Sequence, residues 1–220
     1  MAQVASNHIN NLILNATTKA ETAEQIAFFK SLRTDIWFKS PADRILKAYV
    51  LAWLSAHPAS TPIPCTAAAA EAPTLEIPVC PKDRAIPFTG VTLLRDINKH
   101  PLPFCFLSVS QTFPTVDAIV FGKKLLITVQ VTASSRHSAN SSAFKQIWDH
   151  LPLAIRQKYK WCHVFVTGDE GTAATLRRQQ RENPPGIVIF YYSAVFEVGQ
   201  LGLIRKHLNE VVSRALVICN

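Results

Sequence analysis

Two β-type runs stand out in the hydrophobic pattern of the chain, one over residues 114–121 and one over residues 124–132. Alternating side chains of a strand point to opposite faces, so the second run predicts one apolar and one mostly polar face. A polar strand beside a strand that carries a lone acid, Asp117, is typical of a shallow active site on a sheet. It is equally typical of a half-solvated hairpin. The apolar face comprises Leu125, Ile127, Val129 and Val131, and the other face Lys124, Leu126, Thr128, Gln130 and Thr132.

The pattern before these runs predicts a helical segment over residues 1–57. Apolar residues recur at helix-like spacing over residues 5–32. A stronger helix is expected to begin at Ser40-Pro41, because serine is a favoured cap and proline fits the first turn. Residues 58–85 are rich in Pro and Ala and lack a sustained period, so they are predicted to be a linker.

Residues 86–220 show a denser α/β pattern. Its order of elements predicts a mixed β-sheet flanked by helices. A helix over residues 138–158 is expected to be interrupted at Pro152, since proline removes a backbone donor. The other expected elements are a short helix over 88–97, strands over 104–109, 161–167 and 186–193, a basic helix over 172–181 and a closing helix over 200–215.

Composition narrows the class of protein. With 48% hydrophobic and 17% charged residues among 220, the chain is predicted to be globular rather than disordered. No stretch of about 18 apolar residues predicts a membrane span, and the start of the chain shows no secretory signal. The five cysteines include no C-x-x-C pair, so we interpret them as reduced, structural thiols, which favours an intracellular location.

The net charge of +8 is concentrated in the second half of the chain. Residues 1–99 hold 10 Lys or Arg against 8 Asp or Glu, and residues 100–220 hold 13 against 7. A basic surface attracts polyanions, so nucleic acid is the first partner to consider. The alternative is that the charge serves solubility alone.

The expected order is a helix, three strands, a helix and a strand, with an acid on the second strand and a polar pair on the third. This order resembles the restriction-endonuclease-like, PD-(D/E)XK, fold. Asp117, the run Val129-Gln130-Val131-Thr132 and His137 resemble the nuclease-type domain of Crinkler-like effectors and related retrotransposon-hot-spot proteins. The resemblance covers residues 88–195 and implies a nuclease-derived domain that acts on or binds DNA, often in a nucleus. The phosphate-loop motif and targeting segment of Crinklers are missing from this sequence, which fits a small or degraded version.

The resemblance also implies a set of site residues. Nucleases of this fold pair the Asp with a second carboxylate and a Lys on the next strand, where this sequence has Gln130 and Thr132. Asp117 and Gln130 are therefore the predicted ligands of Mg²⁺ or Mn²⁺, bound weakly because an amide oxygen carries no formal charge. Thr132 and His137 are expected to line the site, His137 as a general base or metal ligand.

Other side chains could supply the second carboxylate and the lysine that nucleases of this fold have and this strand lacks. Lys145 lies on the following helix, and Asp43 and Asp96 lie on preceding helices. For each predicted site residue an ordinary structural interpretation stays open. Asp117 would then be an acid at a turn or strand edge that pairs with Lys123 or Lys124, and Gln130 and Thr132 would lie on a solvated strand face. His137 would be a loop histidine, and Lys145 a solvated helix residue.

The predicted DNA contacts are basic residues in the second half of the chain. Arginine suits phosphates because its planar fork donates two hydrogen bonds. The leading hypothesis is a DNA-directed, effector-type protein, either a divergent metal-dependent nuclease or a DNA-binding descendant of one. The alternative is an inactive protein-interaction module whose N-terminal helices bind a partner or a second copy. The predicted contacts are Lys123, Lys124, Arg136, Arg177, Arg178 and Arg181.

Overall fold

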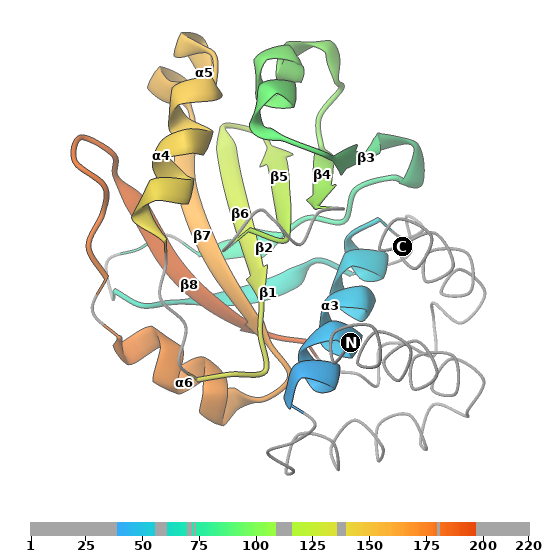
Figure 1. The fold of residues 1–220 in the computed structure, drawn as a ribbon, viewed down its shortest axis with the longest axis vertical. Coiled ribbons are helices and arrows are strands. Elements are labelled where there is room, and N and C mark those ends of the chain that lie inside the picture. The colour runs from blue at the N-terminus through green and yellow to red at the C-terminus, as the bar shows by residue number, and fades with distance from the viewer. Residues whose placement is uncertain are drawn as a thin grey trace, which may run out of the picture.

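The fold is an eight-stranded mixed sheet with helices packed against it (Figure 1). The computed structural model describes residues 39–55, 61–69, 72, 74–108, 116–135, 140–179 and 181–196. The strand order is β2-β1-β8-β7-β6-β5-β4-β3. The predicted mixed α/β class with helices flanking a sheet is confirmed. None of the helices in the described ranges is long and apolar enough to cross a membrane.

The helices and strands follow the predicted order from residue 104 onwards. The helix expected over 138–158 is two helices, and Pro152 separates them. The helix expected over 88–97 is a 3-10 helix that follows a short strand. The elements are α3 (Lys39–Leu54), β1 (Ile63–Ala67), β2 (Leu75–Ile77), η2 (Lys82–Arg84), β3 (Ala85–Phe88), η3 (Val91–Lys99), β4 (Phe104–Ser108), β5 (Ala118–Gly122), β6 (Leu125–Val131), α4 (Ser141–His150), α5 (Leu153–Lys158), β7 (Lys160–Thr167), α6 (Glu170–Arg178) and β8 (Ile189–Val195).

The centre of the sheet combines two kinds of pairing. Strands β4, β5 and β6 are antiparallel neighbours, and a tight turn at Lys123 and Lys124 joins β5 to β6. Strands β7 and β8 run parallel to β6. Parallel neighbours need a crossover connection, which α4 and α5 provide between β6 and β7, and α6 between β7 and β8. Asn140 and Asp169 cap α4 and α6 by accepting backbone N–H groups.

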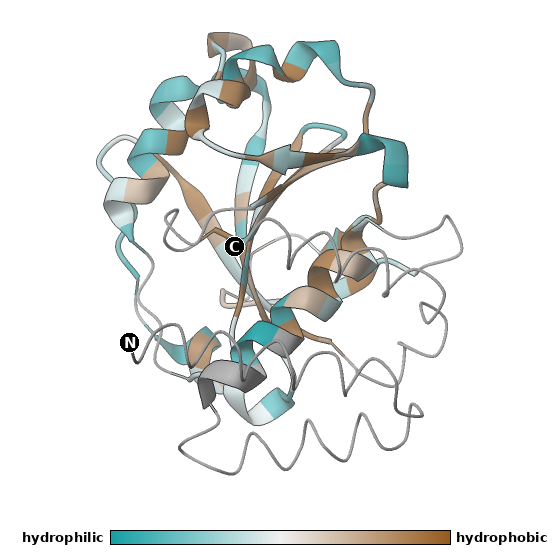
Figure 2. Cartoon of the chain, turned by 45° about the vertical axis from the view of Figure 1, so that its right-hand side comes forward, coloured by the Kyte–Doolittle hydropathy of each residue, from teal (hydrophilic) through white to brown (hydrophobic). Residues whose placement is uncertain are grey.

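Two cores lie on opposite faces of this sheet. The α3 face joins Tyr49 and Trp53 of α3 to Val129 of β6 in one cluster of buried residues. The α4 face joins Phe144 of α4 to Phe121 of β5 in another. Figure 1 shows the central strands between α3 and α4. In Figure 2 these strands are largely hydrophobic, and hydrophilic residues gather on the helices.

The segment expected to be a linker takes part in the sheet. Residues 63–67 form β1, which pairs antiparallel with β8, and residues 75–77 form β2, which pairs with β1. Strands this short leave little periodic signal among prolines and alanines, and pairing with β8 stabilises them because it satisfies backbone groups at the sheet edge. Helix α3, from the segment expected to precede the linker, packs in the same core. The helices expected over 5–32 and 200–215 lie outside the described residues.

The described cysteines are free thiols, in agreement with the sequence-based interpretation. Cys80, Cys105 and Cys162 are buried and Cys65 is half-buried. Burial raises the pKa of Cys65 to about 12 and that of Cys162 to about 11. Both thiols therefore stay protonated at neutral pH, as expected of structural cysteines.

Candidate functional site at the end of β6

The candidate site begins where β5 stops pairing with β6. The last backbone bond of this pair runs from Asp117 N to Val129 O, at 2.7 Å. Beyond it, Thr132 N still donates to Val166 O of β7, at 2.9 Å. On the β5 side, the N–H groups of Val131 and Ala133 need other acceptors, because buried backbone donors are almost always paired.

Two carboxylates accept these N–H groups. Asp117 Oδ2 accepts from Val131 N at 2.7 Å, and Asp43 Oδ1 accepts from Ala133 N in a short hydrogen bond. Val131 and Ala133 are two residues apart on one edge, so their N–H groups lie about 7 Å apart. Of the two carboxylates suggested for the missing charge, Asp43 thus lies at the same strand edge as Asp117.

Lys47 completes the group. Its Nζ lies 2.6 Å from Asp117 Oδ1, and the Lys47 and Asp117 side chains are 32% and 15% exposed. Asp43 and Lys47 are four residues apart on α3, so they share one face of the helix. We call Asp43, Lys47 and Asp117 the acid–lysine cluster. The sequence analysis missed Lys47, because residues 1–57 were expected to form a segment separate from the α/β domain. The spacing of four residues between Asp43 and Lys47 is the signal that could have found it.

Gln130 and Thr132 belong to the other face of β6. Val129 and Val131 pack in the α3-face core and Leu126 in the α4-face core, so alternation directs Gln130 and Thr132 toward the α4 side. Gln130 is 4% exposed and Thr132 is 0% exposed, which corrects the alternative that they form a solvated strand face. The Thr132 hydroxyl is engaged in a local turn, where it accepts from Ser134 N at 2.9 Å and donates to Ser134 O at 3.3 Å.

A buried polar network occupies the α4 face next to Gln130. Thr128 Oγ1 lies 2.9 Å from His163 Nδ1, accepts from Trp161 Nε1 at 3.0 Å and donates to Cys162 O at 3.3 Å. The rings of Phe144, Phe165 and Tyr191 contact the His163 ring.

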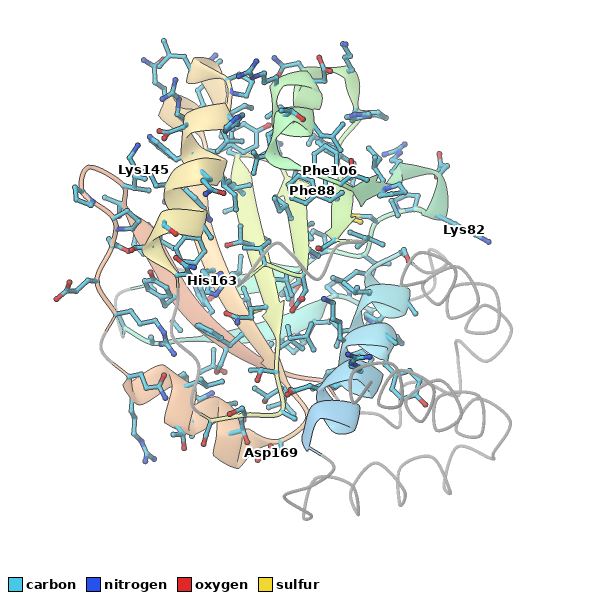
Figure 3. All side chains as sticks on the ribbon, in the orientation of Figure 1. Lys82, Phe88, Phe106, Lys145, His163 and Asp169 are labelled. Carbon is cyan, nitrogen blue, oxygen red and sulfur yellow. The ribbon has the colours of Figure 1, made fainter. Side chains whose placement is uncertain are left out.

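His163 is fully buried, and Figure 3 shows it beside α4. The sequence analysis did not single it out, although a histidine inside the apolar run Trp161-Cys-His-Val-Phe-Val is a visible signal. Its contacts with Thr128, Phe144 and Phe165, which are all buried, are those of a core residue that fixes the packing of α4.

The remaining candidates for the missing charges lie apart from the cluster. Lys145 Nζ pairs with Asp149 at 2.6 Å on the exposed side of α4 (Figure 3). Asp96 pairs with Lys99 at 2.9 Å on η3, where both side chains are exposed. His137 and Arg136 lie outside the described residues.

Two of the three predicted arginines, Arg177 of α6 and Arg181 of the loop after it, make contacts within the chain. Arg177 Nη1 donates to Ser193 Oγ at 2.7 Å, and Nη2 pairs with Glu170. The Arg181 guanidinium stacks 4.3 Å above the Phe165 ring and donates to Leu176 O at 2.6 Å. Burial lowers the pKa of Arg181. The third predicted arginine, Arg178, is exposed.

Four exposed lysines gather at the opposite end of β5 from the acid–lysine cluster. Lys123 and Lys124 form the β5–β6 turn, and Lys158 and Lys160 lie where α5 leads into β7. Lys160 N donates to Lys124 O at 3.0 Å, so the two segments are adjacent. Neither residues 122–125 nor residues 151–160 contain an acid. We call Lys123, Lys124, Lys158 and Lys160 the lysine end.

The acid–lysine cluster does not fit the Mg²⁺ or Mn²⁺ site that the resemblance implies. Such ions need several oxygen ligands in a near-octahedral arrangement. Both oxygens of Asp117 are engaged, one by Lys47 and one by Val131 N, and alternation places Gln130 on the other face. Within the described ranges, no three His, Cys, Asp or Glu residues come together as a metal-binding group.

Comparison with known proteins identifies no relative. No family model, curated protein or solved structure matches the chain. The resemblance to restriction-endonuclease-like nucleases therefore rests on the residue pattern of the sequence.

Proposed function

We propose that this chain is a DNA-binding domain built on a nuclease-type sheet, without the metal-dependent chemistry of a nuclease. Over the residues that the resemblance covers, the order is η3, β4, β5, β6, α4, α5, β7, which supports the nuclease-type core because a helix, three strands, a helical segment and a strand follow one another as in the resemblance. Asp117 stands at the start of the second of these strands, as the resemblance requires.

The chemistry of the cluster argues against cleavage. A metal-dependent nuclease needs carboxylate oxygens that are available to a cation, and a charged group near the attacked phosphate. Here the ammonium of Lys47 lies against Asp117, and Gln130 and Thr132 are buried side chains of the opposite face. The Asp117 carboxylate instead forms an ion pair with Lys47 and accepts from a backbone N–H group at the edge of β6.

The observation that carries DNA binding is the lysine end. Four exposed ammonium groups lie on two adjacent segments that contain no acid. Lysines placed in this way neutralise phosphates and release condensed counterions, which supplies affinity without reading the base sequence. We therefore expect a salt-sensitive interaction with little sequence preference.

The test is the binding of a fluorescent DNA duplex by the full chain at several salt concentrations. We expect Lys124→Glu/Lys160→Glu to weaken binding by more than about tenfold and to reduce the slope of log K against log salt by about 2. The matched control is Lys99→Glu/Lys145→Glu, which changes the net charge equally at two lysines that are paired with acids.

Two outcomes contradict the proposal. Equal losses in both double variants would mean that net charge alone governs binding, and absent or salt-insensitive binding would favour a protein-interaction module. The same samples are incubated with plasmid and Mg²⁺ or Mn²⁺. Cleavage that Asp117→Ala abolishes would show that the nuclease chemistry survives.

A further inference from the structure

We infer that the Trp148 ring is a stacking platform for an unpaired base, so that the DNA preferred at the lysine end is single-stranded. This inference rests on the proposed function and names the form of DNA that the site takes. Its basis is the difference between Trp148 and the other tryptophans that the structure describes, together with the charges around the Trp148 ring.

Trp148 lacks the contacts of a tryptophan that only packs. Trp53 is 1% exposed, and its indole N–H donates to Thr61 O. Trp161 is 2% exposed, and its indole N–H donates to Thr128 Oγ1. Trp148 is half-buried, and its indole N–H donates to no acceptor in the part of the chain that the structure describes. A buried indole usually has a hydrogen-bond partner, so the N–H of Trp148 is available to water or to a ligand.

The neighbouring Trp161 ring covers the Trp148 ring only in part. The two rings are nearly parallel, with an interplanar angle of 9° and centroids 5.9 Å apart. Parallel rings in contact are separated by about 3.5 Å along their normal, so these two rings are displaced sideways. The buried Trp161 therefore holds the plane of the Trp148 ring and leaves part of its surface for another planar group.

The charges around Trp148 suit a phosphate backbone. The Arg156 guanidinium lies over the Trp148 ring, 5.9 Å from its centroid, and no acid of the described ranges forms an ion pair with it. Lys158 of the lysine end lies two residues further along α5. The next residue of α4, Asp149, pairs with Lys145. A base stacked on Trp148 would therefore have positive side chains beside its phosphates.

A duplex cannot use this platform as a single strand can. Its bases are paired and stacked on one another, whereas an unpaired base offers a free face to a protein ring. Helix α5 lies at the end of the sheet where β5 and β6 are joined (Figure 1), so a strand on Trp148 also reaches the lysine end. The lysines serve both forms of DNA through phosphates, and Trp148 adds affinity for the single strand alone.

The experiment measures how the full chain binds a fluorescent single strand and a duplex of the same mixed sequence. A length of about 16 nucleotides covers the usual site size of a single-strand-binding surface. The proteins are the wild type, Trp148→Leu, Trp148→Phe and Lys124→Glu/Lys160→Glu. At a salt concentration that weakens phosphate contacts, the wild type should bind the single strand at least about fivefold more tightly than the duplex.

The variants separate stacking from charge. Trp148→Leu removes the aromatic ring but keeps an apolar side chain that favours a helix. It should lose at least about fivefold in affinity for the single strand, bind the duplex as the wild type does, and keep the slope of log K against log salt. Trp148→Phe keeps a ring and should retain most of the affinity. Lys124→Glu/Lys160→Glu should weaken both forms and reduce the slope, because it removes phosphate contacts.

Two results would overturn the inference and leave the proposed function intact. One is a wild type that binds the duplex at least as tightly as the single strand. The other is an equal loss for both forms in Trp148→Leu. If neither form of DNA binds, the proposed function fails, and this inference fails with it.

Tryptophan fluorescence decides the matter if Trp148→Leu does not fold. A base stacked on an indole quenches its emission. Quenching of the wild type by the single strand and not by the duplex, which Trp148→Phe abolishes, would support the platform. Equal quenching by both forms, or quenching that survives in Trp148→Phe, would contradict it.

Discussion

Both faces of the central sheet are buried, but they bury different chemistry. On the three central strands, the α3 face carries apolar residues such as Val129 of β6, Val164 of β7 and Ala194 of β8. The α4 face of the same strands carries buried polar residues in addition to apolar ones. These polar residues are Thr128, Gln130, Thr132, His163, Thr167 and Ser193.

The difference separates polar residues that pack in a core from charged residues that form an ion pair at a strand edge. Most polar residues of the α4 face have partners within the fold: Thr128 and His163 bond to each other, the Thr132 and Thr167 hydroxyls donate to the backbone, and Ser193 accepts from Arg177 of α6. The charges of the acid–lysine cluster lie instead at a strand edge, beside α3. A polar face on β6 therefore does not indicate an active site, because neighbouring elements cover it.

The largest expected effect concerns the α3 face. Trp53 is 1% exposed, contacts the Phe196 ring and donates from Nε1 to Thr61 O. Trp53→Ala should lower the free energy of unfolding by about 3–5 kcal/mol, because it leaves a large cavity in an apolar core. Urea denaturation measures this loss. The matched control is Trp148→Ala, because Trp148 of α4 is half-buried and stacks on Trp161. An equal loss of stability in this variant would contradict the dominance of the α3 face.

A second prediction tests the buried polar network on the α4 face. Thr128→Val keeps the shape of the side chain but removes the partner of Trp161 Nε1 and His163 Nδ1. We expect a loss of about 2–3 kcal/mol in the free energy of unfolding, since two buried groups lose a hydrogen bond. Thr128→Ser keeps the hydroxyl and should lose less. A neutral Thr128→Val would mean that the network contributes no stability.

A third prediction uses pH to distinguish the two faces. The Tyr49 hydroxyl lies in the α3-face core, has no hydrogen-bond partner among the described residues, and burial raises its pKa to about 12. The unfolded chain loses this proton near pH 10. Between about pH 10 and 12 the folded chain therefore binds more protons, and its free energy of unfolding falls as pH rises, by up to about 3 kcal/mol.

Tyr49→Phe is the matched variant for this pH dependence. It removes a buried, unpaired hydroxyl, so its stability at pH 7 should equal or exceed that of the wild type. Its alkaline loss of stability should be smaller than that of the wild type. The measurement is Tm against pH for both proteins, and parallel curves would assign the alkaline loss to other groups.

The smallest expected effect lies on the solvent side of α4. Lys145 and Asp149 form an exposed pair at i, i+4, and such pairs contribute about 0.3–0.5 kcal/mol. Lys145→Ala should therefore change Tm very little and should leave the α4-face core intact. A large fall in Tm would show that Lys145 has a role beyond this pair, as the sequence-based site hypothesis assumed.

Much of the fold could be predicted because its signals are local. The strands over 104–108, 160–167 and 189–195 appear as apolar runs, and Pro152 separates α4 from α5. Strands β1 and β2 could not be predicted in the same way. They are short, and they exist because β8 offers an edge that the local sequence does not encode.

For the candidate site, too, some features were predictable from the local sequence and others were not. The sequence by itself determined that Asp117 stands at the start of a strand and that Gln130 and Thr132 share a face of the next one. Only the tertiary structure decided that helix α3 brings Asp43 and Lys47 to Asp117, and that α4 covers Gln130 and Thr132. The physical reason is that alternation along a strand assigns side chains to faces, whereas the packing of distant helices decides which face is buried and which charges meet.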